Sequence, residues 1–301
     1  MTTPVLFLIH RRPRLTQKVF QAIREVRPPV LLVAADGPSD DSRCRETRSS
    51  VLNQIDWPCS VETRLLEDNE GCKLAVSGAL DWAFSRHARL IVIEDDCLPS
   101  PSFFQFCEEL LNRYENVPKV MQICGANLSG RIATDGSDYY VSRFATIWGW
   151  ASWRRSWATY DLAMSDWPCE RERASQLANC TSKKEWLWRL EIFNAAHCGE
   201  IDTWDHQWEY AKWKSGGLSL IPSRNLVSNL GWGNDATHTH DTNDPRAAMP
   251  ADSLFFPLRH PVSLCEDSVA DQAYFDRCCR EPSFARRALN KLRRFAKRPL
   301  P

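Results

Sequence analysis

Three consecutive carboxylates, Glu94, Asp95 and Asp96, follow an unbroken apolar run over residues 90–93. Three acids at one point repel one another, and they cannot all be ionised cheaply unless a cation lies among them. Carboxylate oxygens are the ligands that Mg²⁺ and Mn²⁺ prefer in proteins. The segment therefore predicts a divalent-metal site that holds a phosphorylated ligand. The alternative is a strand end that continues into a solvated acidic turn.

A sheet must position these acids. An apolar run without alternation, β-branched at 91–93, is typical of a strand buried on both faces of a mostly parallel sheet. Alternation of such strands with helices predicts an α/β fold in which residues 1–125 form a nucleotide-binding half. We expect strands over 5–9, 30–35, 60–66, 90–93 and 120–124, with helices over 15–26, 41–54, 72–84 and 103–114, the last opened by a capping box at Ser102 and Gln105.

Charged side chains also follow the first two expected strands, namely Arg11 and Arg12 after the first and Asp36 after the second. Ligands of open α/β sheets bind at the carboxyl ends of strands, where the acids also lie. The first strand is not followed by G-x-G-x-x-G, and the chain contains no G-x-x-x-x-G-K-[ST], so neither a dinucleotide fold nor a P-loop is supported. The arrangement suits a nucleotide diphosphate, with Asp36 on the base or ribose and a metal neutralising the pyrophosphate.

The second half, residues 126–260, is less regular and looks built on the first. We expect a loop-rich link over 125–140, a short helix after the Trp-rich run 148–153, a helix to 197 opened by a capping box at Ser182 and Glu185, a helix from about 203 and a strand at 218–221. Ten of the thirteen tryptophans lie between Trp148 and Trp213. Core packing and a surface that stacks against sugar rings both account for this concentration.

Bulk composition excludes several classes. With 38 basic and 38 acidic residues the net charge is zero, so we expect no nucleic acid as a partner. No apolar run approaches the ~20 residues of a membrane span, and the start lacks a signal peptide's layout. Twelve scattered cysteines without a Cys-x-x-Cys pair indicate reduced thiols in a cytoplasmic protein rather than a zinc site. The tail 283–301, within an extension that begins at 261, is basic and amphipathic, which fits either a peripheral membrane contact or a solvated helix.

The acid cluster and the Phe103-Phe104 pair after it resemble the Glu-Asp-Asp segment and Phe-Phe helix of N-acetylglucosaminyltransferase I and its relatives. The chain also resembles a group of bacterial glycosyltransferase-like proteins related to that enzyme. Four landmarks in order carry this resemblance, Asn-Glu-Gly-Cys-Lys at 69–73, Trp-Gly-Trp-Ala-Ser-Trp at 148–153, Thr-Trp-Asp-His-Gln-Trp at 203–208 and Asp-Ala-Thr-His-Thr at 235–239. With the acid cluster, they span about Val5 to His240. The implied fold is GT-A, that of nucleotide-diphospho-sugar transferases.

The resemblance implies roles for the donor side. Asp96 would coordinate the metal, Mn²⁺ or Mg²⁺, whereas Glu94 and Asp95 would hold the ribose and the donor sugar. Two further positions match ones that bind the uridine. The first is Arg11 or Arg12, and the second is Asp36.

Asp205 matches the family's catalytic base, although the second acid of the family's Trp-Asp-Asp segment is His206 in this chain. An acid in the first turn of a helix is also favoured by the helix dipole, whatever the chemistry. His238 matches a late loop from which many GT-A enzymes supply a metal ligand, and His240 is a weaker candidate; a surface position is the alternative for both. Lys73, at a helix start, is a candidate for the pyrophosphate or an ordinary exposed lysine.

The sequence therefore predicts a metal-dependent, inverting glycosyltransferase that moves a sugar from a nucleotide diphosphate, by preference UDP, to a glycan or lipid-linked glycan in cell-surface polysaccharide synthesis. A sugar-phosphate nucleotidyltransferase is one rival, but it would need a Gly-rich basic loop where residues 10–13 contain no glycine. A non-catalytic carbohydrate-binding or scaffold protein on the same fold is the second.

Overall fold

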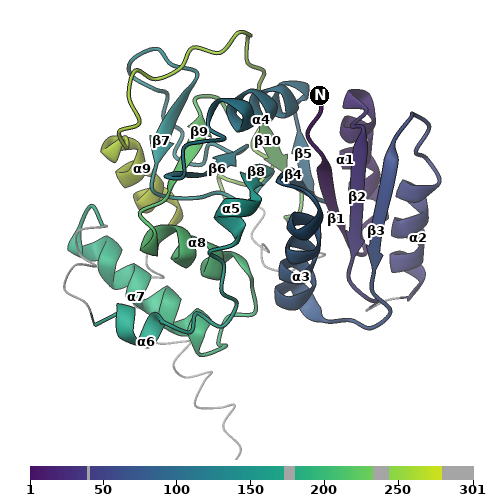
Figure 1. Cartoon of the computed structure of the whole chain (residues 1–301), viewed down its shortest axis with the longest axis horizontal. Coiled ribbons are helices and arrows are strands. Elements are labelled where there is room, and N and C mark those ends of the chain that lie inside the picture. Colours follow the sequence, from purple (N-terminus) through teal and green to yellow (C-terminus); the bar gives the residue numbers. More distant parts are fainter. Residues whose placement is uncertain (39–40, 173–179, 233–243, 280–301) are drawn as a thin grey trace, which may run out of the picture.

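An eight-stranded sheet forms the centre of the computed structural model, which describes residues 1–38, 41–172, 180–232 and 244–279 (Figure 1). The strand order is β3-β2-β1-β4-β8-β6-β9-β7, and all strands except β7 and β8 run in one direction. The strands are β1 (Val5–Ile9), β2 (Val30–Ala35), β3 (Ser60–Leu65), β4 (Arg89–Glu94), β6 (Val120–Cys124), β7 (Tyr139–Ser142), β8 (Trp150–Trp153) and β9 (Leu218–Pro222). The predicted α/β class, a mostly parallel central sheet with flanking helices, is confirmed.

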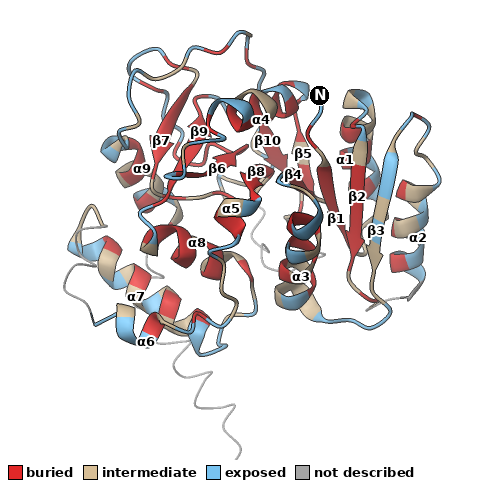
Figure 2. Ribbon diagram, viewed as in Figure 1, coloured by how far each residue is buried: buried red, intermediate tan, exposed pale blue. Residues whose placement is uncertain are grey.

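Both faces of the sheet are covered, which explains why the first strands lack alternation. In β1, Val5 and Phe7 contact the core under one set of helices, and Leu6 and Leu8 contact the core under the other. Figure 2 shows the strands buried, apart from the edge strand β3, and the outer helix faces exposed. The first set is α1 (Pro13–Val26), α2 (Asp41–Leu52) and α4 (Pro101–Arg113), and the second is α3 (Gly71–Arg86), α5 (Arg154–Trp157) and α8 (Asp205–Lys214).

The second half of the chain continues the same sheet. Strand β8 pairs antiparallel with both β4 and β6, so Ala151 lies between Ile91 and Ile123. The short helix expected after the Trp-rich run is α5, whereas the strand that residues 150–153 of the run form was not predicted. Trp150 packs on one face of the sheet and Trp153 on the other, so the run forms a strand buried on both sides, and helical structure begins only with α5.

Several smaller elements were not predicted. Strands β5 (Cys97–Pro99) and β10 (Val227–Asn229) pair antiparallel in a second, two-stranded sheet. Helices α6 (Trp167–Glu170) and α9 (Ser268–Cys278) were likewise not predicted, whereas α7 (Lys183–His197) is the helix expected to reach residue 197. No helix in the described ranges is long and apolar enough to cross a membrane. The basic tail predicted to contact a membrane lies outside the described residues.

The two predicted capping boxes differ in outcome. In α4 the prediction was wrong, because the helix begins at Pro101 after Ser100, and the Ser102 hydroxyl instead accepts the backbone N–H of Leu254 at 3.1 Å. In α7 the Ser182 hydroxyl accepts the backbone N–H of Glu185 at 3.2 Å, as expected. Glu185 does not return the bond to Ser182, since its carboxylate is engaged by Thr181 and Arg189.

Most tryptophans in the cluster belong to the core. Seven of the ten between Trp148 and Trp213 are buried, and the rings of Trp150 and Trp204 stack with centroids 5.8 Å apart. The remaining three, Trp148, Trp186 and Trp188, are half-buried. All twelve cysteines are unpaired, as expected of reduced thiols.

Candidate active site

A cavity of about 760 Å³ opens at the carboxyl ends of β1, β2 and β4. Because these strands are parallel neighbours, their ends meet at one edge of the sheet and bring residues 10–12, 36 and 94–96 into one wall. The opposite wall comes from residues 144–148 and 201–206 and from α7, α8 and α9. The cavity therefore joins the two halves of the chain.

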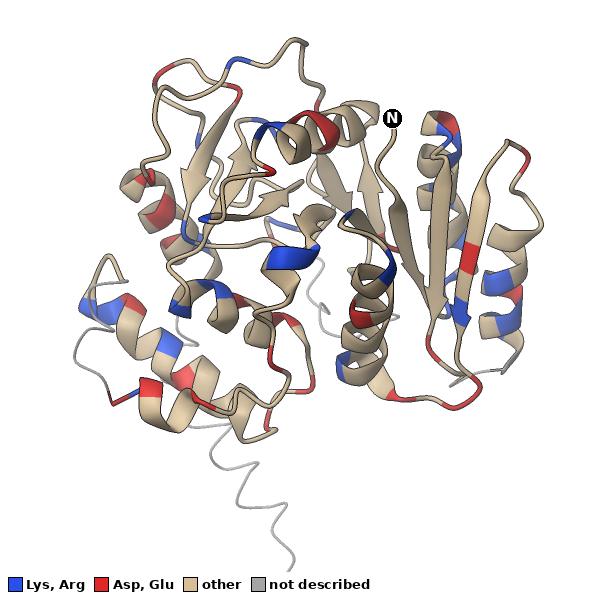
Figure 3. Ribbon diagram, viewed as in Figure 1, with Lys and Arg blue, Asp and Glu red and all other residues tan. Residues whose placement is uncertain are grey.

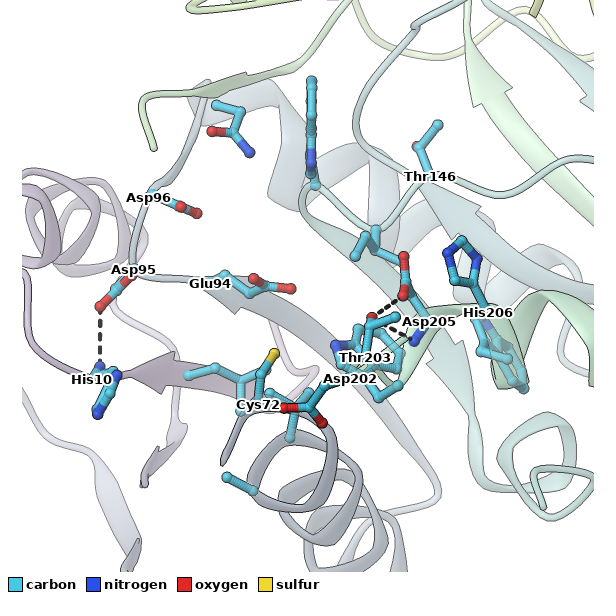
Figure 4. Close-up of a pocket in the computed structure, with 18 of the residues that line it drawn as sticks. His10, Cys72, Glu94, Asp95, Asp96, Thr146, Asp202, Thr203, Asp205 and His206 are labelled. Carbon is cyan, nitrogen blue, oxygen red and sulfur yellow. Dashed lines mark hydrogen bonds between the residues drawn. The ribbon is translucent and has the colours of Figure 1, made fainter. Parts of the chain in front are cut away.

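The acid cluster ends β4, and two of its three side chains point into the cavity. Figure 4 shows Glu94 and Asp96 directed toward the cavity and Asp95 directed toward β1. One carboxylate oxygen of Asp95 accepts the backbone N–H of His10 at 3.0 Å and the hydroxyl of Thr16 at 3.3 Å. Asp95 therefore ties the end of β4 to the end of β1 and the start of α1.

Mutual repulsion and burial disfavour full ionisation of this cluster. Burial raises the pKa of Glu94 well above its ordinary value, and the charges of Asp96 and Asp95 add to the shift. Burial, followed by the charge of Asp96, raises the pKa of Asp95 to about 7. Glu94 Oε1 is buried without a hydrogen-bond partner among the described residues. An oxygen in this state is suited to a cation or to a hydroxyl of a ligand.

The two arginines after β1 differ in whether they form ion pairs. Arg12, at the start of α1, forms an ion pair with Asp96 and lies 3.7 Å from a carboxylate oxygen of Asp95. Arg11 also lines the cavity, and no ion pair to it exists within the described ranges. Arg12 thus supplies positive charge to the acid cluster, whereas Arg11 remains available to an anionic ligand.

Asp36 lines the cavity, but its carboxylate is bound by the chain itself. Its oxygens accept the backbone N–H groups of Gly37, Glu70 and Gly71 at 2.8 to 3.0 Å and the side-chain amide of Asn69 at 2.9 Å. Helix α3 begins at Gly71 without a side-chain cap from its own N-cap residue. Asp36 therefore caps α3 across the loop and fixes that helix against the cavity.

Asp205 is the first residue of α8 and faces the acid cluster across the cavity (Figure 4). The Thr203 hydroxyl donates a hydrogen bond to Asp205 Oδ1. No described residue donates to Oδ2, so this oxygen is available to a ligand in the cavity. His206 lines the same wall. The helix start thus orients a carboxylate with one committed and one open oxygen.

The cavity wall carries an excess of acid. Seven carboxylate side chains line it against three arginines, and the loops before α3 and before α8 are both acidic (Figure 3). The excess affects Cys72, whose pKa is raised to about 12 by burial and then by the charges of Glu94 and Asp205. A diphosphate could enter this environment only with additional positive charge. The seven acids are Asp36, Glu94, Asp95, Asp96, Asp202, Asp205 and Glu209.

One predicted site residue does not join this arrangement, and another cannot be placed. Lys73 lies in the first turn of α3 but is not among the residues that line the cavity, since that turn presents Gly71 and Cys72 instead. His238 lies outside the described residues, as does His240. The segment that leads toward them does reach the site, because Leu230 donates its N–H to the Asp96 carbonyl at 2.7 Å.

Sequence reasoning missed three groups of cavity residues. Gly231 approaches Asp96 so closely that an added Cβ would lie 1.9 Å from Asp96 Oδ2. Glu209 follows Asp205 by one helical turn, a spacing that predicts a shared helix face, but no role in the site was predicted for it. Tyr274 and Cys278 come from α9, in what was treated as an extension, and no local signal in the sequence relates them to the site.

No protein-family model and no curated protein sequence matches the chain. Among solved structures, UDP-glucose pyrophosphorylase complexed with UDP-glucose matches at a TM-score of 0.29 with 14% identity, over 47% of this chain and 62% of that one. HddC from Yersinia pseudotuberculosis complexed with GMP-PN matches at 0.35 with 9% identity, over 51% and 78%. S. aureus TarS 1–349 matches at 0.42 with 8% identity, over 75% and 59%. These similarities are low, and the chain spans less than two thirds of the pyrophosphorylase and of TarS.

Proposed function

We propose that the protein is a metal-dependent glycosyltransferase of the GT-A class. It would transfer a sugar from a nucleotide diphosphate, by preference UDP, to a hydroxyl of a glycan or lipid-linked glycan. The observation that carries the proposal is the placement of Glu94, Asp96 and Asp205 around one cavity. These residues come from segments more than a hundred positions apart, and they are the acids to which the resemblance gives roles.

The donor would occupy the wall formed by the ends of β1, β2 and β4. Arg11 is the basic group available to the diphosphate, and Glu94 Oε1 is the oxygen available to a hydroxyl of the ribose or donor sugar. Asp36 would act by fixing the start of α3 next to the nucleotide, because its carboxylate is already engaged. Asp95 would likewise act by holding the strand ends together.

The residues fit a divalent cation that is shared with a diphosphate. The described part of the chain contains no group of three or more acidic, histidine or cysteine side chains that could hold a metal alone. Mg²⁺ and similar cations commonly use one or two carboxylates together with substrate phosphates. Asp96 would be that carboxylate, and Arg12, which pairs with it, would share or release it. When bound, the cation would neutralise charge on the leaving diphosphate.

Asp205 would act as the base in a single displacement. Its Oδ2 would take the proton from the acceptor hydroxyl as that oxygen forms a bond to the anomeric carbon. The bond from the anomeric carbon to the diphosphate oxygen would break at the same time, and the nucleotide diphosphate would leave with the electron pair. The configuration at the anomeric carbon would be inverted. Thr203 would hold Asp205 in place through its bond to the other oxygen.

Release of UDP from UDP-glucose, UDP-galactose and their N-acetylamino counterparts tests this proposal, with Mn²⁺ and a panel of methyl glycosides as acceptors. We expect Asp205→Asn to lower turnover by roughly 10²–10⁴-fold, the range for loss of a general base. Asp276→Asn is the matched control, because Asp276 is exposed on α9 and is not among the residues that line the cavity. Full activity in both Asp96→Ala and Asp205→Asn would contradict the mechanism. Absence of UDP release from every donor would instead favour a non-catalytic carbohydrate-binding protein.

A further inference from the structure

The cavity continues beyond Asp205 into a region that no predicted site residue occupies. Its walls are Phe144 and Thr146 from the segment after β7, Trp188 on α7, Glu209 on α8, and Tyr274 and Cys278 on α9. We call this region the second compartment. It lies on the side of Asp205 away from the ends of β1 and β2, so a group bound here would approach Asp205 from the side opposite the acid cluster.

Glu209 is the acidic residue in the wall of the second compartment, and a buried side chain behind it fixes its orientation. Arg189 donates to Glu209 Oε1 at 2.8 Å, and the same guanidinium donates to Glu185 at 2.9 Å. Arg189 and Glu185 are fully buried, whereas the Glu209 side chain is 12% exposed. Within the described ranges nothing donates to Glu209 Oε2. This oxygen is thus presented to the cavity by a carboxylate that cannot turn away.

Packing on Arg189 strengthens this constraint. Its guanidinium lies 4.7 Å from the centre of the Phe144 ring, and Phe144 in turn packs against Tyr274 with ring centroids 4.8 Å apart. A buried charge of this kind is stable only while its partners remain in place. The buried ion group therefore connects α7 and α8 to the aromatic wall of the second compartment.

The ionised groups here leave a negative surplus. One positive charge on Arg189 faces two negative charges, on Glu185 and Glu209, and burial lowers the pKa of Lys212, the other cation near Glu209. Arg246, the basic residue in this wall, is neutralised by two hydrogen bonds to Asp244 at 2.6 and 2.8 Å. Asp205 adds a further acid. A ligand that donates hydrogen bonds is therefore favoured in this compartment, and a ligand with its own carboxylate is repelled.

Aromatic side chains complete the ligand preference. Phe144, Trp148, Trp188 and Tyr274 all line the cavity. Flat apolar rings beside a few fixed polar groups are typical of small-molecule sites, and a pyranose offers a matching apolar face together with hydroxyl donors on its rim. Acidic, hydrogen-bond-accepting surroundings with an aromatic wall thus select a sugar rather than a phosphate or a peptide acid.

We propose that the second compartment binds the terminal pyranose of the acceptor, that Glu209 Oε2 accepts a hydrogen bond from one of its hydroxyl groups, and that this sugar carries no acidic group. Glu209 is then a residue that determines acceptor specificity, and Arg189 is the residue that positions it. The inference rests on the proposed function for its meaning as an acceptor site, but the binding preference can be measured without turnover.

The test uses the full chain with Mn²⁺ and UDP and measures the dissociation constants of three probes by saturation-transfer NMR titration. The probes are methyl β-D-glucopyranoside, its 2-amino counterpart and methyl β-D-glucopyranosiduronate. We expect the neutral and amino sugars to bind at least about tenfold more tightly than the glucuronide, which corresponds to about 1.4 kcal/mol. Equal or tighter binding of the glucuronide, or no binding of any probe, would overturn the inference.

Glu209→Gln sharpens the test. We expect it to weaken binding of the neutral sugar by roughly 10–100-fold, the value of a hydrogen bond to a charged group. The difference in affinity between the neutral sugar and the glucuronide should become smaller. Asp276→Asn, at an exposed position on α9, should change neither the affinity for the neutral sugar nor its difference from that for the glucuronide. An unchanged ranking in a folded Glu209→Gln protein would contradict the role of Glu209, and the wild-type ranking decides the sugar class even if that variant does not fold. UDP binding in the same samples separates the two proposals, because its absence would count against the proposed function alone.

Discussion

The two sides of the cavity are built in different ways. The donor side is formed by the ends of adjacent parallel strands, so residues 10–12, 36 and 94–96 meet because β1, β2 and β4 are neighbours. The second compartment is formed by α7, α8, α9 and the segment after β7, which are joined through the buried group Glu185, Arg189 and Glu209. The first arrangement follows from sheet topology, and the second depends on a few specific charged contacts.

This difference implies that the two sides should respond differently to mutation. Backbone pairing supports the donor side, so changes in its side chains should affect ligand binding more than folding. The second compartment depends on a buried ion group, and removal of one charge there leaves another buried without a partner. The next three predictions separate these responses, beginning with the largest effect on stability.

Arg189→Met should lower the free energy of unfolding by about 3–5 kcal/mol, because it leaves Glu185 buried without its cation. Chemical denaturation followed by tryptophan fluorescence measures this effect. Lys214→Ala provides the control, since Lys214 pairs with Asp166 at a half-buried position with access to solvent, and its loss should cost at most about 1 kcal/mol. Equal losses in the two variants would mean that the buried group does not support this side of the molecule.

Gly231→Ala should weaken UDP binding with Mn²⁺ by roughly tenfold or more, about 1.4 kcal/mol of binding free energy, while changing stability little. Its Cβ would lie 1.9 Å from Asp96 Oδ2, so either Asp96 or the segment above it must move. Calorimetric titration measures the change. Gly78→Ala is the matched control, because its Cβ meets only the end of the Arg64 side chain. Unchanged UDP affinity in Gly231→Ala would remove Asp96 from the donor site.

Ser182→Ala should lower the free energy of unfolding by about 1 kcal/mol, the usual value of an N-cap hydroxyl. The Ser182 hydroxyl accepts the Glu185 N–H at the start of α7, the helix that carries Trp188 and Arg189. Ser102→Ala tests the capping box predicted for α4 in the same experiment. Ser102 is not the cap of α4, so any loss there must come from its hydrogen bonds to Leu254 and to the Ser100 hydroxyl.

Sequence reasoning could bring the residues of the proposed donor side together for a physical reason. Buried parallel strands have a strong local signature, and whatever follows them lies at one edge of the sheet, so the sequence alone could bring Arg11, Asp36 and Glu94 together. The sequence could not indicate which of these carboxylates are already hydrogen-bonded within the protein. Asp36 caps α3, and Asp95 accepts a hydrogen bond from His10. These bonds could not be predicted, because their donors are backbone N–H groups, which every residue type except proline offers.

The second compartment could not be predicted for a different reason. Its residues lie far apart in the chain, and Phe144, Trp188 and Tyr274 meet only through tertiary packing. Strand β8 in the Trp-rich run was not predicted, because a strand buried on both faces and a buried helix share the same apolar composition. Glu209 was the one residue of the second compartment that the sequence could have related to the site, since it lies four positions after Asp205 on a predicted helix.

The central claim is that Asp96 holds a cation for a nucleotide diphosphate at the ends of β1 and β4. The most direct test is a thermal-shift and calorimetric comparison of UDP, GDP, CMP and dTDP, each with Mn²⁺ and with EDTA, on the native protein and on Asp96→Ala. The account predicts stabilisation by UDP that requires Mn²⁺ and is lost in Asp96→Ala. Preference for another nucleotide would change the donor but keep the site. Binding of none of the four nucleotides, or UDP binding that is equal in EDTA and in Asp96→Ala, would contradict the account.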